Sequence, residues 1–271
     1  MEKIENILPQ HGRPEPSSSW DTDQSRCDTW NNSHGNLTGY DCPKCMNRGN
    51  FLRKREGGGV YAEDCSCKAI RSCIAEMERS GLKEGIRGMT FEAFKAETSW
   101  QKTVKDGAMK YASNPEGWLL FCGQSGSGKT HLCTAVSRSR LYAGVVVRYM
   151  PWRDKVAELK SLSLDAPRRG EIISSYKNAE LLFLDDLFKT GRGSDGTSRP
   201  TAADIGLAFE IINHRYINHL PTVVSTELTP QELVGIDEAL GSRIIEAAGE
   251  NVFVIGRDIG RNYRLRNIQC V

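Results

Sequence analysis

The chain has 271 residues, of which 39% are hydrophobic and 26% charged, and its formal net charge is +2. This length and composition allow one sizeable domain with a small additional module, or two modest domains. The weak net charge excludes a strongly basic protein, so any nucleic-acid-binding surface has to be local. No run of about 18 apolar residues occurs, so no membrane span is expected. Residues 1–12 lack the apolar stretch of a signal peptide, and a cytoplasmic location is predicted.

The first segment, residues 1–38, is rich in Pro, Ser, Asn and Asp and has no apolar period. Such a composition cannot bury enough apolar surface to offset the entropy of ordering the chain. A disordered tail is therefore predicted there.

A cysteine-rich segment follows, and we assign it to residues 39–75 as a small zinc-binding module. The pairs C-P-K-C and C-S-C are separated by a stretch with a glycine turn between alternating residues, which is typical of a hairpin. Two close cysteine pairs on separate turns can complete a tetrahedral site of four sulfur ligands, which suits Zn²⁺. Because the segment has little apolar material, metal binding would supply most of its folding free energy. The predicted ligands are Cys42, Cys45, Cys65 and Cys67.

Other residues could also take part in this metal site. The C-x-C pair is tighter than the usual C-x₂-C, so Cys73 could replace Cys65 or Cys67, and Cys27 or His34 could act as remote ligands. The alternative interpretation is a group of free buried thiols.

The rest of the chain is expected to contain a helical linker and an α/β domain. Residues 76–113 are predicted to be mostly helical and connecting, with T-F-E-A-F as an apolar anchor. In residues 114–271 short apolar runs alternate with helical stretches, which predicts a parallel sheet with crossover helices. The expected strands are 118–122, 145–150, 181–186, 222–226 and 251–255, and the expected helices are 129–143, 152–162, 202–220 and 237–249.

A glycine-rich motif, G-x-x-x-x-G-K-T, connects the first of these strands to the first helix. Its glycines allow backbone conformations in which successive N–H groups form an anion cradle at a helix N-terminus. Lys129 would contact the β- and γ-phosphates of a nucleotide, and Thr130 would offer its hydroxyl to Mg²⁺. The alternative is a chance glycine turn. The motif predicts a nucleotide site formed by Gly123, Gln124, Ser125, Gly126, Ser127, Gly128, Lys129 and Thr130.

An acidic motif, L-L-F-L-D-D, supports this interpretation. A buried strand that delivers carboxylates at its C-terminal end is a usual place for Mg²⁺ ligation and water activation. We assign Asp185 to the metal and Asp186 to polarising the attacking water. The alternative is a strand followed by an acidic turn. Cys122 and Cys133, which flank the glycine-rich loop, are predicted to be packing residues.

Three short basic segments, at residues 52–56, 148–153 and 166–170, are candidates for a local nucleic-acid contact. Together with Tyr149 and Trp152 they could bind a single strand by phosphate contact and base stacking. The alternative, which composition alone favours, is a solvated helix face with a buried tryptophan.

In combination these motifs resemble the DnaC/DnaI-type replicative helicase loaders, near the prophage DnaC-like replication proteins. More distantly, they resemble the transposition ATPase IstB. The resemblance covers about residue 40 to the end of the sequence, and its motifs are specific in order and combination. It rests on C-P-K-C and C-S-C, M-T-F-E-A-F, G-Q-S-G-S-G-K-T-H-L, L-D-D-L-F-K, residues 209–228 and 236–246, and N-Y-R-L.

The resemblance implies an α/β fold of the P-loop AAA+ type, with a parallel five-stranded sheet of order 5-1-4-3-2 after the zinc-binding module. It implies ATP or ADP, Mg²⁺ and Zn²⁺ as cofactors. Its implied partners are single-stranded DNA, a DnaB-type replicative helicase, and further copies of the chain in a ring or spiral. The implied function is an ATPase that delivers the helicase during initiation of DNA replication.

Two other functions are weighed against this one. An IstB-like helper ATPase would bind duplex DNA and recruit a transposase, but that group generally lacks a cysteine module. A non-enzymatic zinc adaptor with a vestigial nucleotide fold is disfavoured because Lys129, Thr130, Asp185 and Asp186 are all present.

The resemblance also suggests roles for residues outside the two motifs. Arg243 matches the arginine finger that reaches the nucleotide of a neighbouring subunit, although its position on an amphipathic helix is equally compatible with an intrachain salt bridge. Arg215 is the runner-up, and Arg264 matches a late arginine of the family. Thr226 and Glu227 are both candidates for the polar sensor, since Glu227 stands where many relatives have Asn. A full helical lid, with its own sensor arginine, is not expected after the last strand.

Overall fold

The computed structural model describes residues 19–82, 85–189 and 199–265. The chain divides into two units, with the boundary between Lys68 and Ala69, inside helix α2 (Cys67–Met77). Residues 1–18 of the expected tail lie outside the described part, and the expected segment borders at residues 38, 75 and 113 stay predictions. In the described ranges no helix is both long and apolar enough to cross a membrane.

The N-terminal unit contains a helix and a β-hairpin. Helix α1 covers Ser19–Asn31, and strand β1 (Asn50–Lys54) pairs in antiparallel fashion with strand β2 (Val60–Asp64). The three glycines of the connecting turn, Gly57–Gly59, all have positive φ, which residues with a Cβ rarely adopt. The hairpin predicted between the two cysteine pairs is thus confirmed.

Helix α1 lies in a segment for which the sequence predicts disorder, and for Ser19–Asn31 that prediction is wrong. The side chain of Asn31 donates to the carbonyl oxygen of Leu52 at 3.0 Å and accepts from the Leu52 N–H at 2.9 Å. The N–H of Gly59 donates to the carboxylate of Asp23 at 2.6 Å. A helix held by polar bonds to the hairpin backbone carries no periodic apolar signal, which is why its composition resembles that of a tail.

The second unit contains a five-stranded sheet, and every neighbouring pair of strands is parallel. The strand order is β4-β5-β6-β3-β7. Counted within this sheet and read from β7, the order is the expected 5-1-4-3-2. The strands are β3 (Trp118–Gly123), β4 (Val147–Pro151), β5 (Leu181–Asp185), β6 (Thr222–Ser225) and β7 (Val252–Ile255).

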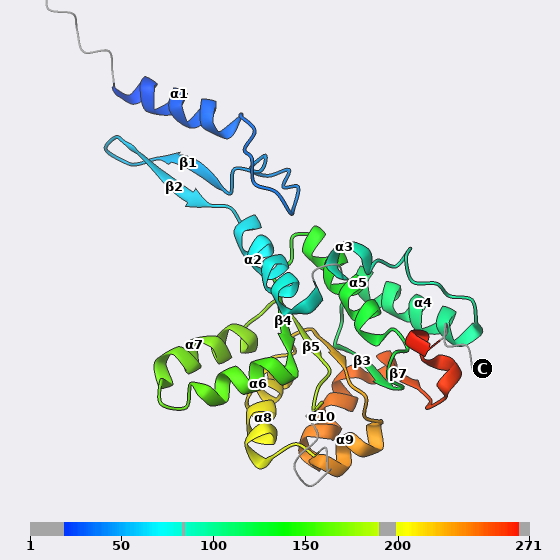
Figure 1. Ribbon diagram of the computed structural model, residues 1–271. Helices are drawn as coiled ribbons and strands as arrows, with labels where there is room; N and C mark the ends of the chain where they lie inside the picture. Colours follow the sequence, from blue (N-terminus) through cyan, green and yellow to red (C-terminus); the bar gives the residue numbers. More distant parts are fainter. Residues whose placement is uncertain (1–18, 83–84, 190–198, 266–271) are drawn as a thin grey trace, which may run out of the picture. The chain divides into compact units, whose positions relative to one another are not determined.

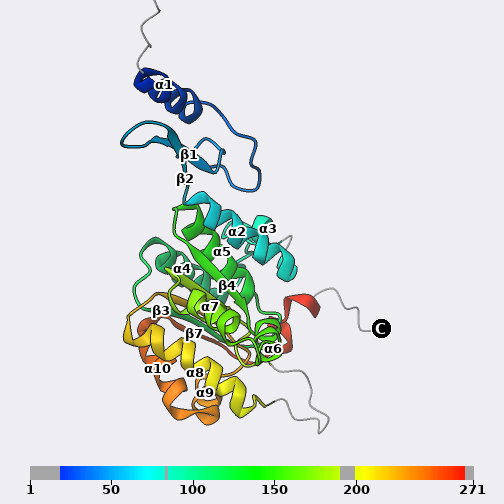
Figure 2. The same cartoon turned by 90° about the vertical axis from the view of Figure 1, so that its left-hand side faces the viewer.

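Helices cover both faces of this sheet (Figures 1 and 2). Helix α5 packs on one face with α4 beside it, and α6, α7, α8 and α10 cover the other. Because both faces are covered, β3 and β5 are buried along their whole length and appear in the sequence as continuous apolar runs. The helices are α4 (Ser99–Ser113), α5 (Lys129–Tyr142), α6 (Trp152–Ser161), α7 (Ala166–Lys177), α8 (Ala202–Ile217) and α10 (Glu238–Ala248).

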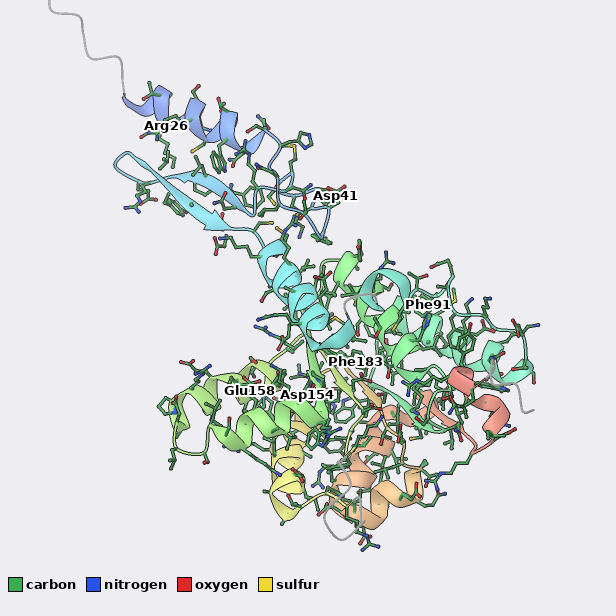
Figure 3. The ribbon with its side chains drawn as sticks, viewed as in Figure 1. Arg26, Asp41, Phe91, Asp154, Glu158 and Phe183 are labelled. Carbon is green, nitrogen blue, oxygen red and sulfur yellow. The ribbon has the colours of Figure 1, made fainter. Side chains whose placement is uncertain are left out.

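The hydrophobic core of this unit lies between the sheet and the two helical layers. Trp118, Leu120 and Cys122 alternate along β3 and pack toward the α6–α8 and α10 layer. Phe183 of β5 lies inside the unit (Figure 3). Cys122 and Cys133 are fully buried, and burial raises the pKa of both thiols, that of Cys122 to about 12. Their expected role as packing residues is confirmed.

Helices α7 and α9 (Pro230–Ile236) were also not predicted, although both carry local signals. Helix α7 begins where a polar gap was expected: Asp165 accepts from the N–H of Arg168 at 3.2 Å, and a proline stands in the first turn. Helix α9 begins with a capping box between Thr229 and Glu232. The remaining short elements are a π-helical turn (Glu78–Leu82), α3 (Gly85–Gly88) and 3₁₀ turns at Gly249–Asn251, Ile259–Arg261 and Tyr263–Leu265.

Candidate functional site

The glycine-rich loop connects the end of β3 to the first turn of α5. Gly123, Gly126 and Gly128 have φ values of 98°, 72° and 93°. A Cβ at Gly123 would collide with the carbonyl oxygen of Ile255, and one at Gly128 would lie 2.7 Å from the ring of Phe94. Glycine is therefore required at these positions for conformation and for space. Such a loop at a helix N-terminus is suited to bind an anion through backbone N–H groups.

Lys129 lies inside this loop, with a relative exposure of 5%. Its ammonium group donates to the carbonyl oxygens of Gly123 and Gln124, both at 2.8 Å. Burial lowers the pKa of Lys129, and the negative charges of Glu227 and Asp186 oppose that effect. A buried ammonium group that is bonded only to neutral carbonyls would be stabilised by an adjacent anion, so the loop is suited to bind a phosphate.

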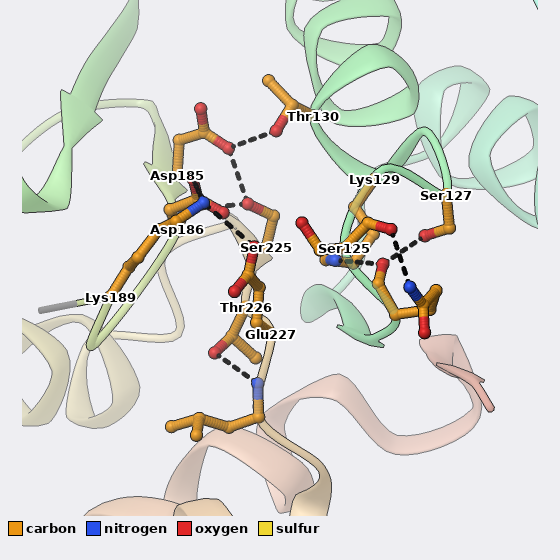
Figure 4. Close-up of polar contacts among 12 residues, drawn as sticks. Ser125, Ser127, Lys129, Thr130, Asp185, Asp186, Lys189, Ser225, Thr226 and Glu227 are labelled. Carbon is orange, nitrogen blue, oxygen red and sulfur yellow. Dashed lines mark hydrogen bonds and ion pairs between the residues drawn. The ribbon is translucent and has the colours of Figure 1, made fainter. Parts of the chain in front are cut away.

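Asp185 lies at the end of β5 and brings the two motifs together (Figure 4). Its Oδ1 accepts from the Thr130 hydroxyl at 2.9 Å and from the Ser225 hydroxyl at 2.6 Å, and its Oδ2 accepts from the Tyr149 hydroxyl at 3.0 Å. Burial raises the pKa of Asp185, the neighbouring charge of Asp186 adds to this, and the three hydrogen bonds oppose it. Hydroxyl and carboxylate oxygens are ligands that Mg²⁺ accepts, so Thr130 and Asp185 fit this metal.

The turn directly after β5 contributes two charged side chains to the same place. Asp186 and Phe188 have φ values of 54° and 62°, which are uncommon without glycine. The N–H of Asp186 donates to the Ser225 hydroxyl at 2.9 Å and so fixes the turn against β6. The ammonium group of Lys189 then lies 2.9 Å from the Asp186 carboxylate and 2.9 Å from that of Glu227 (Figure 4).

The two sensor candidates lie in different environments. Thr226 is fully buried, and its hydroxyl donates to the carbonyl oxygen of Leu187 at 2.9 Å and accepts from the N–H of Leu228 at 3.2 Å. Glu227 lines the cavity described below. Burial alone would raise the pKa of Glu227, but the hydrogen bond from Lys189 and the neighbouring positive charges bring it below its ordinary value. A ligand in the cavity could therefore contact the charged Glu227 side chain, whereas the Thr226 hydroxyl is hydrogen-bonded to the backbone of the fold.

A cavity of about 400 Å³ opens over the loop. Its polar lining consists of loop residues 125–130 and the charged side chains that follow β5 and β6. This volume falls in the range of small-molecule sites, which combine apolar walls with a few convergent polar groups. The rest of the lining comprises mainly Met89, Phe94, Trp100, Arg261, Tyr263 and Arg264. Of these residues, only Arg264 was a predicted candidate for the site.

Arg243 lies outside this cavity. Its Nη1 donates to the carbonyl oxygen of Ala239 at 2.7 Å. Its guanidinium group lies 5.4 Å from the ring centre of Phe209 and 5.7 Å from that of Tyr216. Within the described part of the chain Arg243 forms no ion pair, so the intrachain salt bridge considered as its alternative role is not seen there.

Arg215, the runner-up for the arginine finger, is a structural residue. It is fully buried, and burial lowers its pKa to about 10. A guanidinium enclosed in this way cannot reach another subunit, so the runner-up assignment is wrong. Its donors contact the Thr222 hydroxyl at 2.9 Å and the carbonyl oxygens of Tyr176, Lys177, Ala179 and Pro221 at 3.0, 3.1, 2.8 and 2.6 Å.

The aromatic residues of the second basic segment are also structural. Tyr149 and Trp152 are each 2% exposed. Trp152 packs edge-on against Phe188, with ring centres 5.3 Å apart, and the Tyr149 hydroxyl is bound to Asp185. The buried-tryptophan alternative is confirmed, and stacking of a single strand on these two rings is excluded.

The four predicted cysteine ligands lie together in the N-terminal unit. Their sulfur atoms are within 4.8 Å of one another, with Cys42 and Cys65 3.8 Å apart and Cys45 and Cys67 3.5 Å apart. A tetrahedral site with Zn–S bonds of about 2.3 Å separates its sulfur atoms by about 3.8 Å, so the cluster fits zinc. Burial alone would raise the pKa of Cys45, but the Gly49 N–H and the neighbouring thiols lower it to about 7, which favours the ligating thiolate.

The alternative ligands do not join this cluster. Among the described His, Cys and acidic residues, the four cysteines are the only group of this kind. Cys73 is fully buried, and burial raises the pKa of its thiol to about 12. Cys27 and His34 do not belong to the cluster either.

Comparison with known proteins finds related sequences and folds. A family model described as IstB-like ATP binding protein matches residues 59–254. The chain is 33% identical over 244 residues to the phage-like element PBSX protein XkdC of Bacillus subtilis, covering 85% of this chain and 88% of XkdC. It is 23% identical over 204 residues to the replicative helicase loader DnaC of Escherichia coli, covering 69% of this chain and 79% of DnaC.

Comparison with solved structures shows a shared fold over part of this chain. The crystal structure of DnaI matches with a TM-score of 0.51 and 19% identity, covering 64% of this chain and 93% of DnaI. The replication initiator DnaA bound to AMPPCP and single-stranded DNA matches with a TM-score of 0.48 and 23% identity, covering 63% of this chain and 50% of DnaA.

Proposed function

The chain belongs to the family of IstB-like ATP-binding proteins, with an AAA+ domain of the DnaC type, and from this premise we propose that it is an ATP-dependent helicase loader. It would bind a DnaB-type replicative helicase and single-stranded DNA, and deliver the helicase during initiation of DNA replication. The observation that supports this most directly is the convergence of Lys129, Thr130, Asp185 and Asp186 from separate motifs on one site.

In this proposal each residue of the site acts on the nucleotide in a defined way. The backbone of the glycine-rich loop binds the phosphates, and Lys129 exchanges its carbonyl partners for phosphate oxygens. Thr130 and Asp185 would hold Mg²⁺, which neutralises charge on the phosphates when bound. Asp186 orients the attacking water and accepts its proton.

Arg243 is proposed to act on the cavity of a neighbouring copy. It does not line the cavity of its own chain, and its guanidinium is held over aromatic rings on the surface of α8 without an acidic partner in the described part. Self-association into a ring or spiral would bring it to the terminal phosphate of the next subunit, where a positive charge stabilises the transition state.

The cysteine module is proposed to bind zinc and to contact the helicase. Among the relatives, DnaC is a replicative helicase loader. The zinc site would fix a hairpin that is too small to fold on apolar contacts alone.

The deciding experiment is co-purification with the host replicative helicase, with and without ATP, from cells that express the full chain. We expect wild type to retain the helicase in an ATP-dependent manner and Lys129→Ala to lose both ATP binding and retention. Arg243→Ala should keep ATP binding and lose hydrolysis. Arg257→Ala is the matched control, since Arg257 is an exposed arginine that pairs with Glu232 and does not line the cavity.

Two results would overturn these assignments. Normal ATP hydrolysis by Arg243→Ala would refute its role as a finger. Retention of a transposase instead of the helicase would favour the second candidate, an IstB-like helper ATPase; the matching family model is itself described as IstB-like.

A further inference from the structure

Lys189 is a charged residue of the cavity for which neither the glycine-rich motif nor the acidic motif provides a role. Its ammonium group lies between two carboxylates, 2.9 Å from Asp186 Oδ2 and 2.9 Å from Glu227 Oε1. It lines the same cavity as Ser125, Lys129 and Thr130. The side chain is 37% exposed, so an incoming ligand can reach it.

The backbone at Lys189 is held firmly by the fold. The N–H of Leu187 donates to the carbonyl oxygen of Ser225 at 2.8 Å, and the N–H of Lys189 donates to that of Asp186 at 2.9 Å. The ring of Phe188 is buried against Trp152. Two positive φ values in this turn, at Asp186 and Phe188, are thus kept in place, and such conformations persist only where the surroundings fix them.

The charges around Lys189 are arranged for exchange with an anion. Lys129 and Lys189 place two ammonium groups in one cavity, and the charge of each disfavours that of the other. Asp186 and Glu227 compensate them in the structure described. A ligand with several negative charges can replace part of this compensation, because a phosphate oxygen is as good a partner for an ammonium as a carboxylate is.

The position of Lys189 selects which phosphate it can contact. In a site of this type the inner phosphates lie in the loop, and the outermost phosphate lies toward the metal-binding carboxylate. Lys189 follows that carboxylate, Asp185, by one turn of chain and contacts Asp186, the residue proposed to orient water. An ammonium at this place is close to the terminal phosphate of a triphosphate, and a diphosphate leaves that position empty.

We propose that Lys189 is a second phosphate-binding cation of the site. When ATP binds, its ammonium group exchanges the Asp186 carboxylate for the terminal phosphate and keeps its ion pair with Glu227. This proposal rests on the proposed function as an ATPase. Two consequences follow. Lys189 distinguishes ATP from ADP, and Asp186 becomes free to orient water only when a triphosphate is present.

Calorimetric titration of the full chain with Mg²⁺ and either AMPPNP or ADP tests the proposal. Lys189→Met removes the charge while keeping most of the length of the side chain. We expect it to weaken AMPPNP binding about tenfold, the lower end for a charge-assisted hydrogen bond at a partly exposed site. ADP affinity should stay within about twofold. Lys189→Arg should restore most of the preference for AMPPNP, and Lys189→Gln provides a second variant if Lys189→Met does not fold.

The matched control is Lys177→Met, since Lys177 pairs with Glu210 and lies outside the cavity; both affinities should be unchanged. An equal loss for AMPPNP and ADP, or no loss for either, would overturn the proposal, and a gain in AMPPNP affinity would show that Lys189 blocks the site. If wild type binds neither nucleotide, or binds both as Lys129→Ala does, then the proposed function itself fails, whatever Lys189 does.

Discussion

Arg215 offers a direct test of whether sequence resemblance or burial decides the role of an arginine. Arg215→Met removes the guanidinium and keeps an unbranched side chain of similar length. The change leaves the Thr222 hydroxyl and four carbonyl oxygens, those of residues 176, 177, 179 and 221, without their present donor. We expect a less stable fold and no specific effect on hydrolysis.

The magnitude follows from the contacts. Each buried acceptor that loses its partner costs about 1–3 kcal/mol, but such costs are not additive and water reaches some of the freed groups. Because the costs for five acceptors do not add, we take about 3–5 kcal/mol in total for Arg215→Met. For a domain of about 200 residues this corresponds to a fall of roughly 10 °C in Tm. Arg215→Lys keeps the charge but offers only three donors, so we expect a loss of about 2 kcal/mol.

Urea unfolding followed by tryptophan fluorescence measures this effect, because Trp118 and Trp152 are buried in the same unit. Arg243→Ala serves as the comparison, and we expect its free energy of unfolding to lie within about 0.5 kcal/mol of wild type while its hydrolysis is lost. A wild-type midpoint for Arg215→Met together with lost hydrolysis would refute the reasoning and reinstate Arg215 as a finger.

Three further predictions concern other parts of the chain. Cys45→Ser should reduce bound zinc, measured by elemental analysis, from one ion per chain to near zero, and a full complement in the variant would contradict the site. Gly128→Ala places a methyl group against the ring of Phe94 at positive φ, so nucleotide affinity should fall about tenfold by calorimetry; unchanged affinity would show that the loop tolerates a Cβ. Burial alone would raise the pKa of Asp204, but the bond from Lys160 and the helix cap lower it, so its contribution is present at neutral pH and lost as pH falls below about 4. Asp204→Asn should therefore flatten the dependence of the urea midpoint on pH between about 5 and 3, and an unchanged acid dependence would assign the effect elsewhere.

The sheet could be predicted from the sequence because its strands are buried on both faces. Runs such as W-L-L-F-C and L-L-F-L-D need no partner to be recognised, and each became a strand within one or two residues of its expected ends. Helix α1 could not be recognised in this way, since its order comes from bonds to a hairpin that begins some twenty residues later.

The glycine-rich loop and the residues Lys189 and Arg215 were predictable to different degrees. The glycine-rich loop is a local pattern whose geometry follows from its own residues. Lys189 ends the motif L-D-D-L-F-K, but the motif does not give its role, because that depends on Glu227, which the parallel pairing of β5 with β6 brings beside it. The same holds for Arg215, whose position on α8 gives no indication that it is enclosed by carbonyl groups.

The cavity has consequences for how the protein is divided for experiments. The N–H of Tyr263 donates to the carbonyl oxygen of Gly126 at 2.8 Å, and His131 bonds to the carbonyl oxygen of Thr90 at 2.8 Å. The chain segments before and after the sheet thus form walls of the same chamber as the loop. A recombinant fragment that starts at residue 114, where the sequence places the domain border, would keep the glycine-rich and acidic motifs and lack one wall of the cavity. A fragment from about Gly88 to Arg264 is the shortest that preserves the whole chamber.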